Sequence, residues 1–165
     1  MKTMLLFALA AFAAMADNHP WGNFKPGSWV KMKSTTNAGP SKITSETKMT
    51  LIEKTATNAV VETESTVMGQ STKTRANIPL NATGTATPGV KPATMPTTGN
   101  ETLTVAGKQV ACKWFESESN TNGMKVNSKS WTSDAVPGGM VKSVSKMSGA
   151  MKSETTVEVV AFEAK

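Results

Sequence analysis

The feature that most constrains this chain is a succession of short stretches rich in Val, Thr, Ile and Trp, each followed by a turn signal. Almost no segment shows the i, i+3, i+4 spacing of apolar residues that an amphipathic helix requires. Beta-branched and aromatic residues favour strands, whereas Gly, Asn and Pro between them favour tight turns. The pattern predicts about eight or nine antiparallel strands. The candidate ranges are Ser28–Thr36, Lys42–Lys54, Ala59–Val67, Ser71–Ile78, Glu101–Val105, Gln109–Ser119, Met124–Ser133, Met140–Met147 and Met151–Glu163.

The alternation of side chains within these stretches indicates what kind of sheet they form. In the last stretch Thr155, Val157 and Val159 share one face, and Val160 and Phe162 then interrupt the alternation, which predicts a strand end covered on both faces. Many inward positions elsewhere are Ser or Thr, so the core is expected to be thin. We therefore expect an all-β fold: an antiparallel meander in one strongly bent sheet or open half-barrel, completed by the last strand.

The N-terminus has the features of a signal peptide. Lys2 supplies a positive charge, and the apolar run from Met4 to Ala14 is too short to span a bilayer. Ala14-Met15-Ala16 matches the small-x-small pattern of a cleavage site, which predicts cleavage between Ala16 and Asp17. Residues 1–16 are thus expected to be removed, and residues 17–165 to form a single all-β domain that is periplasmic or extracellular. The mature chain has no later apolar run of about 18 residues, so it is not expected to span a membrane.

Residues 81–100 differ in composition from the rest of the chain. They are rich in Thr, Gly and Ala and contain three prolines, with no apolar periodicity. Such a segment is typical of a flexible connection, and it is longer than most loops in compact domains. We expect a flexible Thr/Pro-rich loop that divides the sheet into two halves.

The residues that carry most enzyme chemistry are scarce. The chain has one Cys and one His. Cys112 lies in an apolar stretch and His19 lies at the start of the mature chain, so burial of Cys112 is favoured over a catalytic Cys–His pair. Two carboxylate pairs, Glu62/Glu64 and Glu116/Glu118, each share a strand face. They are suited to binding a cation or to acid–base work, but a solvated face balanced by cross-strand Lys is the simpler interpretation. We expect no enzymatic activity, no metal and no cofactor.

The net charge is +6, which raises the question of an anionic partner. The Lys residues are spread along the chain with Glu between them, whereas nucleic-acid sites concentrate Arg and stacking aromatic residues. A nucleic-acid partner is therefore not expected. Weak, salt-sensitive attraction to anionic envelope polymers is compatible with this charge.

The aromatic and Met residues allow two interpretations. Trp114 and Trp131 lie on either side of the turn at 120–123 and are expected in neighbouring strands. They either anchor the core of a chain that has only 5% aromatic residues, or they line a concave apolar groove. In the second case the groove would also include Met32, Met49, Met124 and Met140, because Met adapts to varied apolar ligands.

Four segments carry a resemblance to known proteins: 25–31 (KPGSWVK), 50–62 (TLIEKTATNAVVE), 101–114 (ETLTVAGKQVACKW) and 131–142 (WTSDAVPGGMVK). Together they resemble uncharacterised small exported bacterial β-sheet proteins, and more distantly the lipoprotein-carrier half-barrels of the LolA/LppX type. The resemblance implies an exported, curved antiparallel sheet, and it carries no functional motif.

From the sequence we expect an exported, non-enzymatic binding or carrier module for an apolar or cell-envelope-derived ligand, such as a lipid. The alternative is a structural or interaction protein of the cell envelope, and a hydrolase comes third because no convergent polar cluster is found. A carrier requires an apolar cavity of some hundreds of Å³, whereas a structural protein is expected to have a filled core or an exposed apolar patch.

Overall fold

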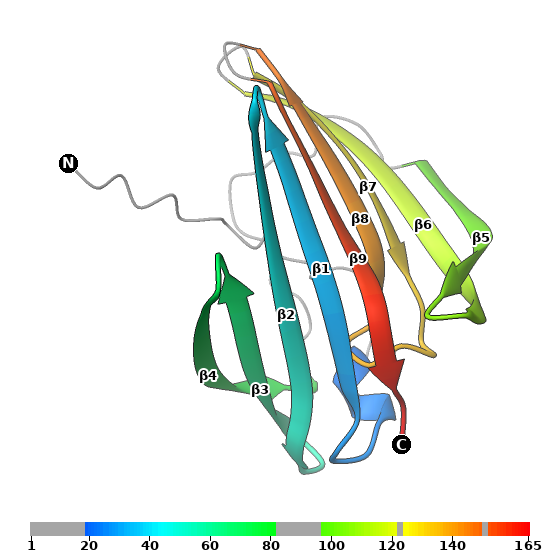
Figure 1. Ribbon diagram of the computed structural model, residues 1–165. Helices are drawn as coiled ribbons and strands as arrows, with labels where there is room; N and C mark the ends of the chain where they lie inside the picture. The colour runs from blue at the N-terminus through cyan, green and yellow to red at the C-terminus, as the bar shows by residue number, and fades with distance from the viewer. Residues whose placement is uncertain (1–18, 82–96, 122–123, 150–151) are drawn as a thin grey trace.

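The computed structural model describes residues 19–81, 97–121, 124–149 and 152–165. The expected signal peptide, most of the expected loop at 81–100 and the Asn122-Gly123 turn lie outside the described residues. The described part consists of one short 3₁₀ helix and nine strands (Figure 1). These are η1 (Pro20–Asn23), β1 (Trp29–Ala38), β2 (Ser41–Lys54), β3 (Asn58–Val67), β4 (Gln70–Pro79), β5 (Thr97–Val105), β6 (Lys108–Thr121), β7 (Met124–Thr132), β8 (Met140–Ser148) and β9 (Ser153–Glu163).

Each strand predicted from the sequence is present, with bounds that differ by a few residues. The largest difference is at β5, which begins at Thr97, so residues 97–100 belong to a strand and not to the expected loop. These residues have the Thr and Gly content of the segment before them, and their pairing with β6 shows only in the fold. The predicted all-β class is confirmed.

The nine strands form one antiparallel sheet in the order β4-β3-β2-β1-β9-β8-β7-β6-β5. Two meanders, β1 to β4 and β5 to β9, are joined through the pairing of β1 with β9. The last strand therefore lies in the middle of the sheet, and β4 and β5, which follow each other in sequence, lie at its opposite edges (Figure 1). The sheet is bent and unclosed.

Three β-bulges lie towards the same end of the sheet, where β1 begins and β9 ends. The pairing skips Ile52 between β2 and β3, Val160 between β9 and β1, and Val141 between β8 and β7. A bulge bends its strand and shifts the alternation of the side chains that follow. This explains Val160 and Phe162: Val160 is exposed and Phe162 packs against the core, so the strand end is not covered on both faces as the alternation suggested.

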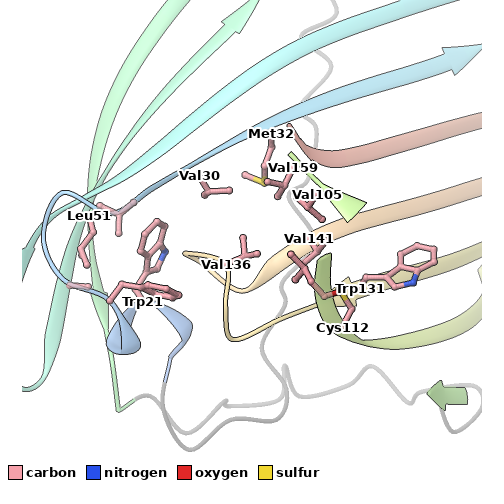
Figure 2. Packing of buried hydrophobic residues seen from close by; sticks show 14 of the residues in the cluster. Trp21, Val30, Met32, Leu51, Val105, Cys112, Trp131, Val136, Val141 and Val159 are labelled. Atoms are coloured by element: carbon pink, nitrogen blue, oxygen red, sulfur yellow. The ribbon is translucent and has the colours of Figure 1, made fainter. Parts of the chain in front are cut away.

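The hydrophobic core lies at this bulged end. Trp21 of η1 is 1% exposed and lies beside Leu51, Val30 and Val136 (Figure 2). Val136 belongs to the segment between β7 and β8. Gly138 and Gly139 of the same segment lie against Trp21 and Pro20 of η1. A Cβ on Gly139, whose φ is +78°, would lie 2.8 Å from Pro20 Cγ, so only glycine fits this contact without displacement.

The segment that carries Trp21 is tied to the sheet at both of its ends. The amide N–H of His19 donates to the carbonyl of Leu80 at 2.9 Å, and His19 Nδ1 accepts from the N–H of Trp21 at 3.3 Å. At the other end, Lys25 N–H donates to the carbonyl of Lys165, whose own N–H donates to Ser28 Oγ. His19 therefore caps η1 and holds the residues that cover the core.

Candidate functional site

The strand register separates the side chains of the sheet into two faces of different chemistry. Directly opposed residues in antiparallel strands share a face, so the pairings can be followed from edge to edge. One such row runs Thr98, Phe115, Ser130, Ser143, Val157, Ser34, Ser45, Val67, Gln70. The adjacent row, which points to the other face, runs Gly99, Trp114, Trp131, Lys142, Glu158, Lys33, Glu46, Thr66, Ser71. The first row has no charged residue.

The rows next to the first one continue its character except at Lys113, which is two residues before Phe115 and pairs with Thr132. We call this surface, bordered on β6 by Lys113, the uncharged face. It consists of alternate residues of eight strands: from Met32 to Ala38, Ser41 to Thr47, Ser65 to Val67, Gln70 to Thr72, Phe115 to Ser119, Val126 to Ser130, Ser143 to Met147, and Ser153 to Val159. Each of these residues is a hydroxyl, amide, aliphatic or aromatic side chain. At the bulged end of the sheet the uncharged face continues into the core around Trp21. Away from that end, most of its residues are half-buried or exposed.

Hydroxyl groups pair across the strands of the uncharged face. The oxygen–oxygen distances are 3.0 Å for Thr36 and Thr155, 3.2 Å for Thr47 and Ser65, 3.0 Å for Ser130 and Ser143, and 2.9 Å for Ser117 and Ser128. A hydroxyl has one donor and two acceptor sites, so each pair retains acceptor capacity after the internal hydrogen bond is made. Such a surface can accept from or donate to an uncharged polar group.

The opposite surface, which we call the charged face, carries the ionised side chains. Lys31 contacts Glu46 at 2.7 Å, and Lys125 contacts Glu118 at 2.9 Å. Glu62 accepts from Arg75 at 2.8 Å and contacts Lys73 at 3.0 Å. These two cations hold the pKa of Glu62 below its usual range, with the Arg75 hydrogen bond as the main cause. The carboxylates of Glu62 and Glu118 are thus balanced by cross-strand cations, as the simpler interpretation of the sequence proposed.

Trp114 and Trp131 are directly opposite each other, as expected, and lie on the charged face. The ammonium of Lys129 is 4.2 Å from the ring centroid of Trp114 and 5.2 Å from that of Trp131. Trp131 Nε1 donates to Glu101 at 2.8 Å. A Cβ on Gly99 would lie 2.6 Å from the Trp114 ring, so that ring lies against the backbone of the edge strand. The chain's own groups therefore contact both indoles.

The four Met residues expected beside the Trp pair are not gathered around it. Met32 and Met49 lie on the side of the sheet opposite to Trp114 and Trp131, and Met32 is part of the buried cluster. Met140 packs against the core at the start of β8, and Met124 is exposed at the far end of β7. Met32 and Trp131 nevertheless both belong to the buried cluster, and Met49, Trp114 and Met140 pack against it, so these five residues are part of the core or adjoin it and do not line one open groove.

Cys112 is buried and its thiol is free. Its Sγ donates to the carbonyl of Val110 at 3.4 Å. Burial raises the pKa of the Cys112 thiol, which disfavours the thiolate needed for nucleophilic chemistry. The burial expected from its apolar neighbours is confirmed.

An open hollow of about 270 Å³ lies beside η1. It is lined by Gly22, Asn23, Lys54, Thr55, Ala56, Leu80 and Asn81, and the ammonium of Lys54 donates to the carbonyl of Gly22 at 3.0 Å within it. The hollow is polar for the most part, so it differs from the apolar cavity expected of a carrier. Among the residues that the structure describes, His, Cys, Asp and Glu form no group of three that could hold a metal ion.

The uncharged face is the feature that sequence reasoning missed as a candidate site. The inward Ser and Thr residues predict a thin core, and they do not by themselves indicate a binding surface. The available signal is the frequent alternation of Ser or Thr with Lys or Glu, as in Lys33-Ser34 and Ser45-Glu46, which Thr35 and Thr44 interrupt. Only the pairing of the strands shows that these positions are continuous across the sheet.

No helix in the described ranges is long and apolar enough to cross a membrane. No protein-family model and no curated protein matches the sequence. The structure is similar to a crystal structure described as a "putative lipoprotein" from Parabacteroides distasonis, with a TM-score of 0.46 and 8% identity over 90% of this chain and 100% of that one. It is also similar to one described as a "putative outer membrane lipoprotein-sorting protein domain" from Vibrio parahaemolyticus, with a TM-score of 0.31 and 7% identity over 88% of this chain and 89% of that one. The similarity is distant and concerns the fold.

Proposed function

We propose that this chain is an exported, non-enzymatic binding or carrier module that holds an apolar or cell-envelope-derived ligand on the uncharged face. The observation that supports the proposal is the separation of charge between the two sides of the sheet. Most Lys and Glu residues of the strands are on the charged face, whereas the residues that define the uncharged face include none and Lys113 borders it on β6. Export is supported by the signal-peptide features of residues 1–16.

The uncharged face suits a ligand that contains hydrocarbon. Ile43 and Val67 are 38% and 43% exposed, and Val157 and Met147 are half-buried near the middle of the sheet and at its far end. Covering such side chains is favourable by about 25 cal/mol per Å² of apolar surface removed from water. A charged side chain in the same place would lose hydration on ligand binding, which opposes association. The lack of charge therefore lowers the cost of covering this face.

One observation favours the alternative of a structural or interaction protein. Strand β4 is an edge strand, and its residues 70–77 are all exposed. An exposed edge can pair with another strand, although Lys73 and Arg75 on β4 oppose such pairing. In that case the protein would associate through β4 and the uncharged face would bind no lipid.

Two adjacent residues of the central strand β1 allow a matched test. Ser34 is on the uncharged face between Val157 and Ser45, whereas Thr35 is on the charged face between Thr156 and Thr44, and both are half-buried. Isothermal titration calorimetry with lipids that share a lauroyl chain would compare Ser34→Lys with Thr35→Lys. We expect Ser34→Lys to weaken binding by about tenfold or more, because the ammonium must be covered by hydrocarbon. Thr35→Lys is expected to leave the affinity within about twofold.

Thermal unfolding would first show that both variants are folded. If Ser34→Lys does not fold, Ser45→Lys with Thr44→Lys as its control repeats the comparison on β2. Failure of the wild-type protein to bind any of the lipids would contradict the proposed function. Equal weakening by the two substitutions would show that the uncharged face is not the site.

A further inference from the structure

The hydroxyl groups of the uncharged face are concentrated near its centre. On β7 and β8, Ser128, Ser130, Ser143 and Ser145 occupy two neighbouring rows, and Thr155 continues one of them on β9. We call these five residues, together with Ser34 on β1, the hydroxyl field. The Ser130 and Ser143 hydroxyls are 3.0 Å apart, and two further members of the field pair with neighbours outside it: Thr155 with Thr36 at 3.0 Å and Ser128 with Ser117 at 2.9 Å.

Apolar side chains border the hydroxyl field on two sides. Val126 and Met147 are paired in the row beyond it, towards the far end of the sheet. On the side of the core, Val159 and Met32 are paired, and Val157 lies between Ser143 and Ser34. A ligand that covers this region thus meets hydroxyl groups and hydrocarbon together, which is the chemistry of an amphiphile.

Most charged groups near the hydroxyl field in the pairing point to the other side of the sheet, and the exception is Lys113, which pairs with Thr132 at the β6 border of the field. Lys142 precedes Ser143 and Lys33 precedes Ser34, and each belongs to the row of the charged face. A carboxylate or phosphate placed over Ser145 and Thr155, away from Lys113, would lose hydration without gaining a cation, and an ammonium would lose it without gaining an anion. An uncharged hydroxyl, ester or sugar group pays a much smaller desolvation penalty and can be hydrogen-bonded by hydroxyls in either direction.

We propose that the ligand of the uncharged face is an uncharged amphiphile: a hydrocarbon chain with a headgroup of hydroxyl, ester or sugar type. The inference rests on the proposed function and names the class of ligand that the same face takes. Its basis is the juxtaposition of the hydroxyl field with Val126, Met147, Val157 and Met32, in a region where the described strands place no charged side chain except Lys113 at its border.

The test compares four probes that have the same hydrocarbon length and different headgroups. Monolaurin and dodecyl maltoside are uncharged, laurate is an anion and dodecyltrimethylammonium is a cation. Their affinities are measured by equilibrium dialysis with the purified mature protein, below the concentration at which each forms micelles. We expect the two uncharged probes to bind at least about tenfold more tightly than either ion, which corresponds to about 1.4 kcal/mol.

Substitution of the hydroxyls provides a second measurement. The Ser34→Ala/Ser145→Ala variant removes two hydroxyls of the field, and Thr35→Val/Thr156→Val removes two from the opposite side of the same region. The first variant is expected to lose most of the preference for uncharged probes, and the second to retain it. Circular dichroism and thermal unfolding establish that both are folded.

The outcomes separate this inference from the proposed function. If laurate or dodecyltrimethylammonium binds as tightly as monolaurin, the assignment of an uncharged headgroup is wrong, while a lipid-binding role stands. If the Ser34→Ala/Ser145→Ala variant keeps the preference for uncharged probes, the hydroxyl field does not determine which headgroup binds, and the inference is also overturned. If none of the four probes binds, the proposed function itself is contradicted.

Discussion

Replacement of Trp21 by Ala is expected to destabilise the fold strongly. The Trp21 side chain is 1% exposed and covers the core end of the sheet together with Val136, so its loss leaves a space beside Leu51 and Val30. A buried Trp removes about 150–250 Å² from water, which at about 25 cal/mol per Å² amounts to roughly 4–6 kcal/mol. Residual burial in the unfolded chain reduces this value, and Trp→Ala substitutions in cores cost about 3–5 kcal/mol. We expect a loss of about 3–4 kcal/mol in the free energy of unfolding.

Urea unfolding followed by far-ultraviolet circular dichroism measures this loss, and the midpoint of thermal unfolding should fall by roughly 10 °C. Trp29→Ala is the matched control. Trp29 is half-buried on the charged face, where Lys48 lies 4.8 Å from its ring centroid and Glu163 accepts from its Nε1. Its removal is expected to cost about 1 kcal/mol. A loss for Trp21→Ala no larger than that for Trp29→Ala would refute the placement of the N-terminal segment over the core.

Three further predictions concern single residues. Burial lowers the pKa of His19, and its neutral Nδ1 accepts from Trp21 N–H. His19 therefore binds a proton more readily in the unfolded chain than in the folded protein. The free energy of unfolding should accordingly fall as pH drops below about 6.5. His19→Gln should reduce this dependence between about pH 7 and pH 5, and identical pH profiles in urea unfolding would contradict the role of His19 as a cap. Burial raises the pKa of Cys112, so its reaction with a thiol reagent should be slow until denaturant is added. Cys112→Ala provides the blank. Labelling of the native protein as fast as that of the denatured protein would place the thiol at the surface. Met68 is 89% exposed and has a φ of 50° before Gly69, a conformation that Asn adopts more easily than Met. Met68→Asn should therefore raise the free energy of unfolding in urea by about 0.5–1 kcal/mol. A lower free energy of unfolding would show that the Met68 side chain stabilises the hairpin.

Local patterns were sufficient to predict the strands. The alternation of Lys with Ser, Val or Met around Val30-Lys31-Met32-Lys33 identifies β1, and positive-φ positions such as Gly69 end the strands where Gly was expected to do so. The order of the strands was predicted less well. Pairing of β9 with β1 brings together residues such as Thr36 and Thr155, which are far apart in the sequence and carry no local mark of their contact.

The candidate site could be predicted only in part, because faces and contacts depend on the global register. The adjacency of Trp114 and Trp131 followed from the hairpin between them. Their separation from Met32 and Met49 did not follow, since it depends on pairings across β8, β9 and β1. The role of His19 was missed for a related reason: its partners, Leu80 and the N–H of Trp21, become available only when the N-terminal segment folds back over the core.

The side of the sheet that receives the ligand is the central claim, and a spin-labelled lipid tests it most directly. Val157 lies on the uncharged face, whereas Val144 and the Trp131 indole lie on the charged face of neighbouring strands. Protein with isotope-labelled Val methyl groups would be titrated with monolaurin that carries a nitroxide on its acyl chain. The proposed site predicts that the methyl signals of Val157 and Val126 broaden at lower concentrations of the spin-labelled lipid than the signal of Val144. Stronger broadening of Val144 and of the Trp131 indole N–H than of Val157 would place the ligand on the opposite side and contradict the account.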